Sequence, residues 1–396
     1  MKKYLLLLAA ALLVAALAAV LIPARRALAP ATTAPSPSPS PAAPPSPSPT
    51  PSPSPSPSPT PSPTPTPTPT PVDIFALTIN PPASPNAAAP LAIPTYDGKG
   101  ETTHPKVLYF PEGWKGYPYW MVHTPYPRCH NKVENPSICV SYDGINWFDP
   151  PGVENPVSGL PPTFNNYAHY SDGHLLMKGD VMELWFRHNG GQDPARNADN
   201  DGARILRIVS SDGIHWSEPE EMIPKQGRKP LLSPAVIWED GFYTMWYSSH
   251  DGKLYRVTSP DGSVWSQQEA TDLAYPGYKV WHQDIIRTDL GYEIVFCAKD
   301  QDGLNDNLQH QELFYAMSED GMHWTEPVKI ISANEAEGAL DNNSIYRASL
   351  VKTSDGYRIY YGAMSNRKQW HIYLSQGESI AQLTGYGITD EKEDES

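Results

Sequence analysis

Two short clusters in this 396-residue chain place histidine close to aspartate. The first runs from His169 to Asp172, and the second contains His282 and Asp284. A pair of carboxylates can serve as general acid and general base, with either order of roles. Histidines beside them can donate protons near neutral pH or bind a metal. We therefore predict Asp284, Asp172 and His282 as catalytic residues.

These residues also have ordinary structural interpretations. Asp172 precedes a glycine and can be a turn residue. Asp284 can instead form a buried hydrogen bond to a neighbouring sheet. A single buried histidine more often forms an ordinary hydrogen bond inside the fold than binds a ligand. Two histidines that line the same pocket favour a functional role. The elements that position these side chains therefore decide between the two interpretations.

A seven-residue motif, Ser-x-Asp-Gly-x-x-Trp, occurs four times, at 141–147, 210–216, 259–265 and 318–324. Asp-Gly favours a tight hairpin turn, because glycine adopts positive φ and the aspartate can cap its own backbone. Repeats spaced by roughly 50 to 70 residues are typical of a propeller or a solenoid. We expect the motif tryptophans to pack between neighbouring sheets, in a structural role.

Segments with the apolar patterns of β-strands surround these turns. Residues 234–238, 242–247 and 253–258 predict three successive strands, and the same order recurs within 175–209, 284–316 and 348–374. The series opens at 105–122, and sustained helical periodicity is absent. The pattern predicts an all-β fold, a five-bladed β-propeller of four-stranded antiparallel blades.

In a propeller the first strand of each blade lines the central channel, so the strand starts converge on one pocket. The expected starts lie at 103–105, 169–172, 232–234, 281–284 and 346–347. The guanidinium of Arg347 can bind the carboxylate of a ligand or pair with a structural aspartate equally well. Core packing explains most of the aromatic side chains at these positions. The predicted substrate-binding residues are His104, His169, Ser233, Trp281, Tyr346 and Arg347.

The repeated turns and the five predicted blades resemble the five-bladed glycoside hydrolases of the arabinanase, xylosidase and invertase-like group, families 43, 32 and 68. The turns also resemble the Asp-boxes of sialidases. The resemblance covers about 103–374 and implies a carbohydrate substrate. Family 43 places an aspartate base, an aspartate modulator and a glutamate acid at the first, third and fourth starts. This sequence has His104, Ser233 and His282 there, so the family triad is absent.

Two functional hypotheses follow. The first is an extracellular glycoside hydrolase that uses carboxylate acid–base catalysis in the central pocket. The second is a non-catalytic carbohydrate-binding or surface-adhesion propeller. The net charge of −15 argues against a nucleic-acid partner, and we expect a monomer.

The N-terminal segment predicts export. A basic head and an apolar run within 1–29 indicate a signal peptide or an N-terminal membrane anchor. Residues 30–91 are rich in proline, serine and threonine and predict an extended linker. The propeller is expected over 92–386 and an acidic tail over 387–396.

No metal is expected to be required. Calcium is compatible with two loops rich in acids and amides, at 193–201 and 300–307, although solvated loops explain them better. Of the three cysteines, Cys129 and Cys139 flank a short connection and can pair in an oxidising compartment, which leaves Cys297 unpaired.

Overall fold

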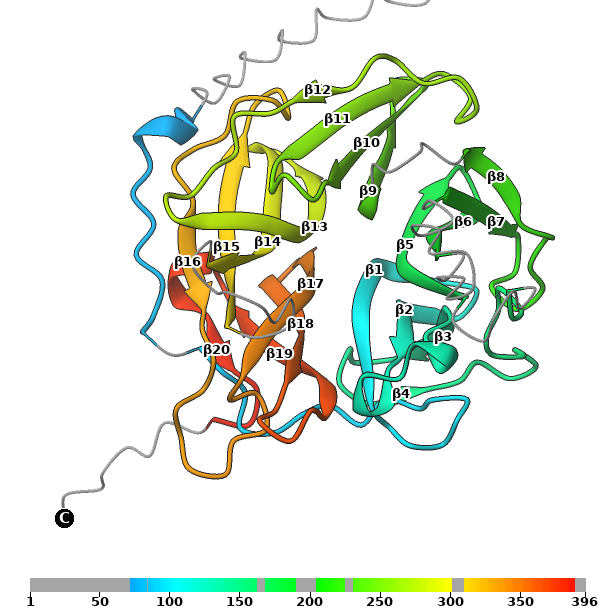
Figure 1. Cartoon of the computed structure of the whole chain (residues 1–396), viewed down its shortest axis with the longest axis horizontal. Helices are drawn as coiled ribbons and strands as arrows, with labels where there is room; N and C mark the ends of the chain where they lie inside the picture. The colour runs from blue at the N-terminus through cyan, green and yellow to red at the C-terminus, as the bar shows by residue number, and fades with distance from the viewer. Residues whose placement is uncertain are drawn as a thin grey trace, which may run out of the picture. The chain divides into compact units, whose positions relative to one another are not determined.

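The computed structural model describes residues 72–83, 85–161, 168–189, 204–224, 231–300 and 310–388. These residues form five four-stranded antiparallel sheets, the blades of a β-propeller, arranged around a central axis (Figure 1). The predicted all-β architecture and blade number are confirmed. The predicted N-terminal anchor, most of the linker and most of the acidic tail lie outside the described residues, as do both candidate calcium loops apart from Asp300.

Within each blade the strands follow one another in chain order from the channel outward. Blade 1 consists of β1 (Thr102–Trp114), β2 (Tyr117–Pro125), β3 (Ser137–Ser141) and β4 (Trp147–Phe148). Blade 2 consists of β5 (His169–Lys178), β6 (Val181–Asn189), β7 (Arg204–Ser210) and β8 (Glu220–Ile223). Blade 3 consists of β9 (Leu232–Glu239), β10 (Phe242–Ser248), β11 (Leu254–Ser259) and β12 (Glu269–Ala270). Blade 4 consists of β13 (Tyr278–Thr288), β14 (Gly291–Asp300), β15 (Gln311–Ser318) and β16 (Val328–Ile331). Blade 5 consists of β17 (Ser344–Thr353), β18 (Gly356–Met364), β19 (Trp370–Gly377) and β20 (Thr384–Gly385).

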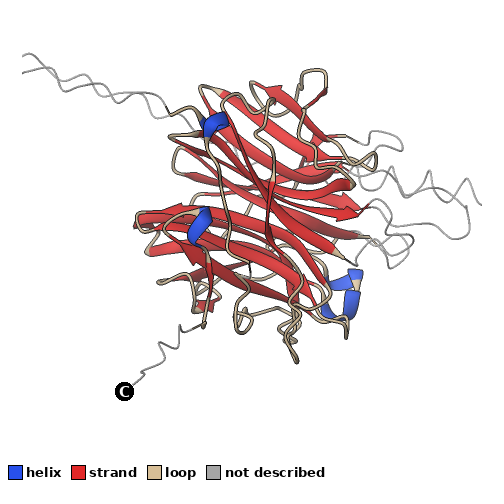
Figure 2. Cartoon of the chain, turned by 90° about the vertical axis from the view of Figure 1, so that its left-hand side faces the viewer, coloured by secondary structure: helices blue, strands red, loops and turns tan. Residues whose placement is uncertain are grey.

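The helices of the described residues are short 3-10 turns, and strands dominate the fold (Figure 2). They are η1 (Ile74–Ala76), η2 (Pro127–Cys129), η3 (Asn131–Val133) and η4 (Ile380–Gln382). In this part of the chain no helix has the length and apolar character needed to cross a bilayer. Cys129 and Cys139 are free thiols, so the disulfide that their spacing suggested is not formed.

The repeated motif forms a self-capped turn between the third and fourth strands of blades 1 to 4. In the second copy, Asp212 Oδ1 accepts hydrogen bonds from the backbone N–H groups of Ile214 and His215, both at 2.8 Å. The hydroxyl of Ser210 accepts the N–H of Gly213 at 2.8 Å. Gly213 has a φ of 79°, which favours glycine. The motif therefore satisfies its own backbone and needs no further partner to form a turn.

Each motif turn also packs on the preceding blade. A Cβ atom on Gly213 would overlap the ring of Trp120, which belongs to blade 1. Trp265 of blade 3 meets the ring of Trp185 of blade 2 at 6.0 Å between centroids. Trp147 of blade 1 meets Tyr360 of blade 5 at 5.8 Å, which continues the pattern around the ring. The predicted structural role of the motif tryptophans agrees with these contacts.

The innermost strand of every blade is interrupted by a bulge-like register shift near its start. The shifts lie between Thr103 and Lys106, between Ser171 and His174, near Ser233, between Val280 and His282, and between Ile345 and Ala348. His104, Asp172 and Ser233 have positive φ values of 54°, 57° and 53°. Bulges re-aim side chains and are common next to active sites. Here they turn polar residues of all five blades towards the channel.

The chain before blade 1 packs along the last blades. Ile74 is buried in the same hydrophobic cluster as Tyr315 and Met317. The N–H of Leu91 donates to the carbonyl of Ile372 at 2.8 Å. Ile74, Ala87 and Leu91 thus belong to the packed structure, although the linker was expected to run to residue 91. Within this segment Ile74–Ala76 forms the short 3-10 helix η1.

Candidate active site

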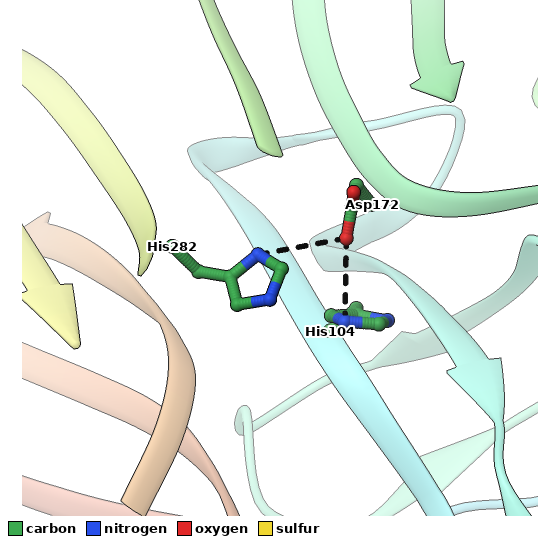
Figure 3. Close-up of side chains that lie close together, drawn as sticks. All are labelled: His104, Asp172 and His282. Atoms are coloured by element: carbon green, nitrogen blue, oxygen red, sulfur yellow. Dashed lines mark ion pairs between the residues drawn. The ribbon is translucent and has the colours of Figure 1, made fainter. Parts of the chain in front are cut away.

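Three side chains from blades 1, 2 and 4 meet at the channel, each placed by one of the register shifts (Figure 3). Nε2 of His104 lies 3.3 Å from Oδ1 of Asp172. Nδ1 of His282 lies 3.6 Å from the same oxygen. All three side chains are buried. Residues separated by up to 178 positions in sequence therefore present nitrogen and oxygen atoms to one point.

The other ring nitrogen of each histidine is held from outside the cluster. Nδ1 of His104 is hydrogen-bonded to the hydroxyl of Thr124 at 2.8 Å. Nε2 of His282 is hydrogen-bonded to the hydroxyl of Tyr346 at 2.7 Å. When these outer nitrogens carry the ring protons, the inner nitrogens present lone pairs towards Asp172. This is the usual arrangement of metal-ligating histidines, whose second nitrogen is fixed by a hydrogen bond.

The cluster fits a cation. The inner nitrogens of His104 and His282 and the Oδ1 atom of Asp172 are buried and lack hydrogen-bond partners among the described residues. The three ligand atoms lie within 4.8 Å of one another. Two imidazoles and one carboxylate suit a first-row divalent ion such as zinc or manganese. Two lone pairs and an anionic oxygen would repel one another without a positive charge between them.

Burial keeps both histidines neutral. It lowers the pKa of His104 to about 3, against an opposing effect of Asp172. It also lowers the pKa of His282 well below its usual value, again opposed by Asp172. Neutral imidazole is the form that binds metals. The site is therefore ready to accept a cation at neutral pH without losing protons from these rings.

Asp172 is held in its ionised form. Burial by itself would raise the pKa of its carboxyl, but the positive charges of Arg187 and Arg347 lower it below its usual value. Nε of Arg187 lies 3.2 Å from Oδ2, and the N–H of Ser233 donates to the same oxygen at 3.3 Å. These contacts occupy Oδ2 and leave Oδ1 for the cation site.

Glu134 is a site residue that the sequence analysis missed. It follows η3 in the connection between β2 and β3, where no motif or apolar pattern marks it. Its Oε1 lies 3.3 Å from Nδ1 of His104, and its Oε2 lies 3.5 Å from Nε2 of His169. Burial, and then the charge of Asp172, raise the pKa of Glu134 well above its usual value. Glu134 and Asp172 therefore contact opposite nitrogens of the same imidazole, and their pKa values are moved in opposite directions.

Asp284 has different surroundings from Asp172. Its two oxygens accept hydrogen bonds from Nζ of Lys106 at 2.8 and 3.0 Å. Its Oδ2 also accepts from the Ser349 hydroxyl at 3.2 Å and from the Leu350 N–H at 3.0 Å. These bonds join blade 4 to blades 1 and 5. These contacts favour the structural interpretation of Asp284. A catalytic role for Asp284 and Asp172 as an acid–base pair stays a prediction.

The remaining predicted residues surround the cluster. The indole N–H of Trp281 donates to the hydroxyl of Tyr346 at 3.3 Å. One face of the Trp281 ring is occupied by Nζ of Lys299 at 4.0 Å, so this ring is not a free stacking surface on that side. Arg347 is fully buried. The predicted substrate-binding positions thus lie around the three candidate ligands.

The chain is similar to known proteins in sequence and in fold. No family model matches the sequence. A curated relative, the A type blood N-acetyl-alpha-D-galactosamine deacetylase of Flavonifractor plautii, is 26% identical over 321 residues, which cover 67% of this chain. The chain spans 40% of that relative's length.

Solved structures share the fold. A crystal structure of an N-acetylgalactosamine deacetylase from F. plautii, in complex with blood group B trisaccharide, has a TM-score of 0.63 and 22% identity. The match covers 73% of this chain and 94% of that one. A family 43 glycoside hydrolase variant from Bacillus licheniformis has a TM-score of 0.52 and 14% identity, over 72% of this chain and 54% of that one. The structural neighbours of this five-bladed propeller therefore include both kinds of protein.

Proposed function

We propose that this protein is a carbohydrate-active hydrolase that removes the acyl group from an N-acylated amino sugar, with a divalent cation held by His104, Asp172 and His282. The observation that carries the proposal is the set of three buried, unpartnered ligand atoms facing one point. The deacetylase relative supports the choice of an amide over a glycosidic bond. In the reaction, water adds to the acyl carbon, the C–N bond breaks, and the departing amine takes a proton.

A cation bound here would polarise the acyl carbonyl and lower the pKa of a water molecule. The residues around it supply orientation and proton transfer. Thr124 and Tyr346 fix the two imidazole rings, and Arg187 fixes the Asp172 carboxylate. Glu134 lies beside His104 and His169, and burial, followed by the charge of Asp172, raises the pKa of its carboxyl well above the usual value. We assign Glu134 as the group that delivers the proton to the leaving amine.

A glycosidase is the second candidate, and one observation favours it. Glu134 and Asp172 contact opposite nitrogens of the His104 ring, and their pKa values are moved in opposite directions. A protonated and an ionised carboxyl are what glycoside hydrolysis requires. In this alternative Glu134 is the acid, and Asp172 replaces Asp284 in the pair expected from the sequence.

One assay distinguishes these functions. The purified full chain is incubated with oligosaccharides that contain N-acetylglucosamine or N-acetylgalactosamine, and both acetate and new reducing ends are measured. Acetate release that stops on chelation and returns with zinc or manganese supports the proposal. New reducing ends without acetate identify the glycosidase, and sugar binding without either product identifies the non-catalytic alternative.

Two substitutions refine the assay. Asp172→Asn should lower metal content and activity together, because it removes the only anionic ligand of the candidate set. Glu134→Gln should keep the metal but lower turnover by about 10² to 10⁴-fold, the usual contribution of a general acid. The exposed Glu154→Gln serves as the matched control and should retain both properties. Full turnover in the Glu134 variant would remove Glu134 from the mechanism.

We propose further that the propeller is exported and tethered outside the cell as a monomer, as the basic head, apolar run and Pro/Ser/Thr segment of residues 1–71 indicate. Protease digestion of intact cells tests this location. Cleavage of the propeller without cell lysis is the expected result, and full protection would contradict it.

A further inference from the structure

Arg347 is a buried charge that the proposed reaction does not use. Its side chain is fully buried on the innermost strand β17, at that strand's register shift. Its Nε, Nη1 and Nη2 atoms all lack a hydrogen-bond partner among the described residues. A guanidinium removed from water is costly unless it is paired and hydrogen-bonded. Such a group points to a ligand or to bound water that completes its contacts.

The channel around Arg347 contains other unsatisfied polar groups. The hydroxyls of Thr103 and Ser233 and the side-chain carbonyl of Gln283 are buried and lack partners within the described part of the chain. They come from β1, β9 and β13, close to the same ring of register shifts. The hydroxyl of Thr103 and the backbone carbonyl of Arg347 both lie against Gly362. Two unsatisfied hydroxyl donors, from blades 1 and 3, and one unsatisfied carbonyl acceptor, from blade 4, therefore share the channel with the arginine.

The carboxylates near Arg347 are bonded to other cations. Asp172 is contacted by Arg187, and Asp284 is contacted by Lys106. Neither carboxylate is hydrogen-bonded to Arg347. A small anion would satisfy the guanidinium.

We propose that the channel at Arg347 is a binding site for a small carboxylate of the acetate class. The planar fork of arginine matches the two oxygens of a carboxylate, which it can bind through two parallel hydrogen bonds. The identity of the anion rests on the proposed function, because hydrolysis of an N-acetyl group releases acetate next to Asp172. Arg347 then receives the carboxylate product, and accumulated product inhibits the enzyme.

Direct binding tests the site independently of turnover. Acetate is titrated into the full chain, with and without a chelator, and binding is followed by calorimetry and by thermal unfolding. Saturable binding is expected, and acetate at ten times its Kd should lower the unfolding equilibrium constant roughly tenfold. Acetamide, which has the same shape without the charge, should not bind. Equal effects of chloride would assign the site to simple anions, and no acetate binding would overturn the proposal.

Substitutions locate the binding. Arg347→Lys keeps the charge but loses the fork, and should weaken acetate binding at least tenfold. Arg287→Lys, on the half-exposed far end of β13, is the matched control and should bind normally. Ser233→Ala is a second variant for the case in which Arg347→Lys does not fold. It should weaken acetate binding several-fold. Unchanged affinity in a folded Arg347→Lys or in Ser233→Ala would overturn the assignment.

The deacetylation assay separates this proposal from the proposed function. Acetate release with no acetate binding would leave the hydrolase intact and remove the carboxylate site. Acetate binding without any acetate release would keep the site as an anion site and remove the deacetylase.

Discussion

At the scale of single residues, the second nitrogen of a buried histidine decides what the first can do. Thr124 and Tyr346 engage the outer nitrogens of His104 and His282, which directs the inner lone pairs towards Asp172. Asp172 and Asp284 are both buried channel aspartates, yet one leaves an oxygen free and the other has both oxygens bound by Lys106. Their neighbours, and not their residue type, separate a candidate ligand from a structural carboxylate.

This difference predicts opposite outcomes for the same substitution. Asp284→Asn should destabilise the fold by about 3 to 5 kcal/mol, because it leaves the buried Lys106 ammonium without its counter-charge. Asp172→Asn should reduce metal binding and turnover, with a smaller loss of stability. Urea unfolding and activity are measured on both variants. A stable but inactive Asp284→Asn would instead restore the acid–base pair expected from the sequence.

At the scale of elements, the sequence predicted the strands and turns well, because each is specified locally. Alternating apolar residues and Asp-Gly dipeptides mark blades 1 to 4 directly. The register shifts carry no comparable signal: His104, Asp172 and Ser233 adopt positive φ although none is glycine. The convergence of first strands still identified most candidate site residues. Glu134 was missed because it lies in an irregular connection, and its role arises from contacts with distant His104 and His169.

The motif glycines offer a test of blade packing. Gly213 and Gly179 both have positive φ, but only Gly213 lies against a neighbouring blade, at Trp120. Gly179→Ala should cost about 1 kcal/mol, the penalty for a side chain in the left-handed region. Gly213→Ala should cost about 1 to 3 kcal/mol more, because its methyl group overlaps the Trp120 ring. Equal losses in urea unfolding would show that the turn does not depend on contact with the preceding blade.

At the scale of the whole molecule, each described sheet is built from four consecutive strands, so no strand is shared between the first and the last blade. The ring therefore closes through side-chain packing between blades and through the segment that precedes β1. The channel then buries charged and titratable groups from blades 1, 2, 4 and 5. This arrangement gives the protein its candidate site, and it also makes its stability dependent on pH and on the residues that precede β1.

Buried histidines predict a loss of stability in acid. Burial lowers the pKa of His123, whose Nδ1 is hydrogen-bonded to the Thr102 hydroxyl, to about 3. The unfolded chain takes up this proton near pH 6.5, and the folded chain does so only near pH 3. Stability is therefore constant above about pH 6.5 and falls between these values by about 1.4 kcal/mol per pH unit for each such histidine.

Urea unfolding of the protein in the presence of a chelator, repeated across this pH range, measures how the free energy of unfolding changes with pH. This slope counts the protons taken up on unfolding, and His123→Gln should lower that number by about one. His104 contributes in the same direction, because its pKa is also lowered to about 3. A slope that is unchanged in the His123 variant would show that this ring is already protonated in the folded state.

The segment before blade 1 predicts a sharp difference between two truncations. Removal of residues 1–71 should leave the propeller stable, because the truncated protein keeps the buried residues that precede β1. Removal of residues 1–91 takes away the buried side chains of Ile74, Ala87 and Leu91. It also removes Asn86, whose amide donates to Asp341 at 2.9 Å. Burial of the isoleucine and leucine alone contributes about 3 to 6 kcal/mol, so the shorter protein should melt at a lower temperature and with less cooperativity. Calorimetry of the two truncated proteins makes the comparison. Identical melting would mean that 72–91 is a linker that merely lies on blades 4 and 5, and that the ring of five blades closes without it.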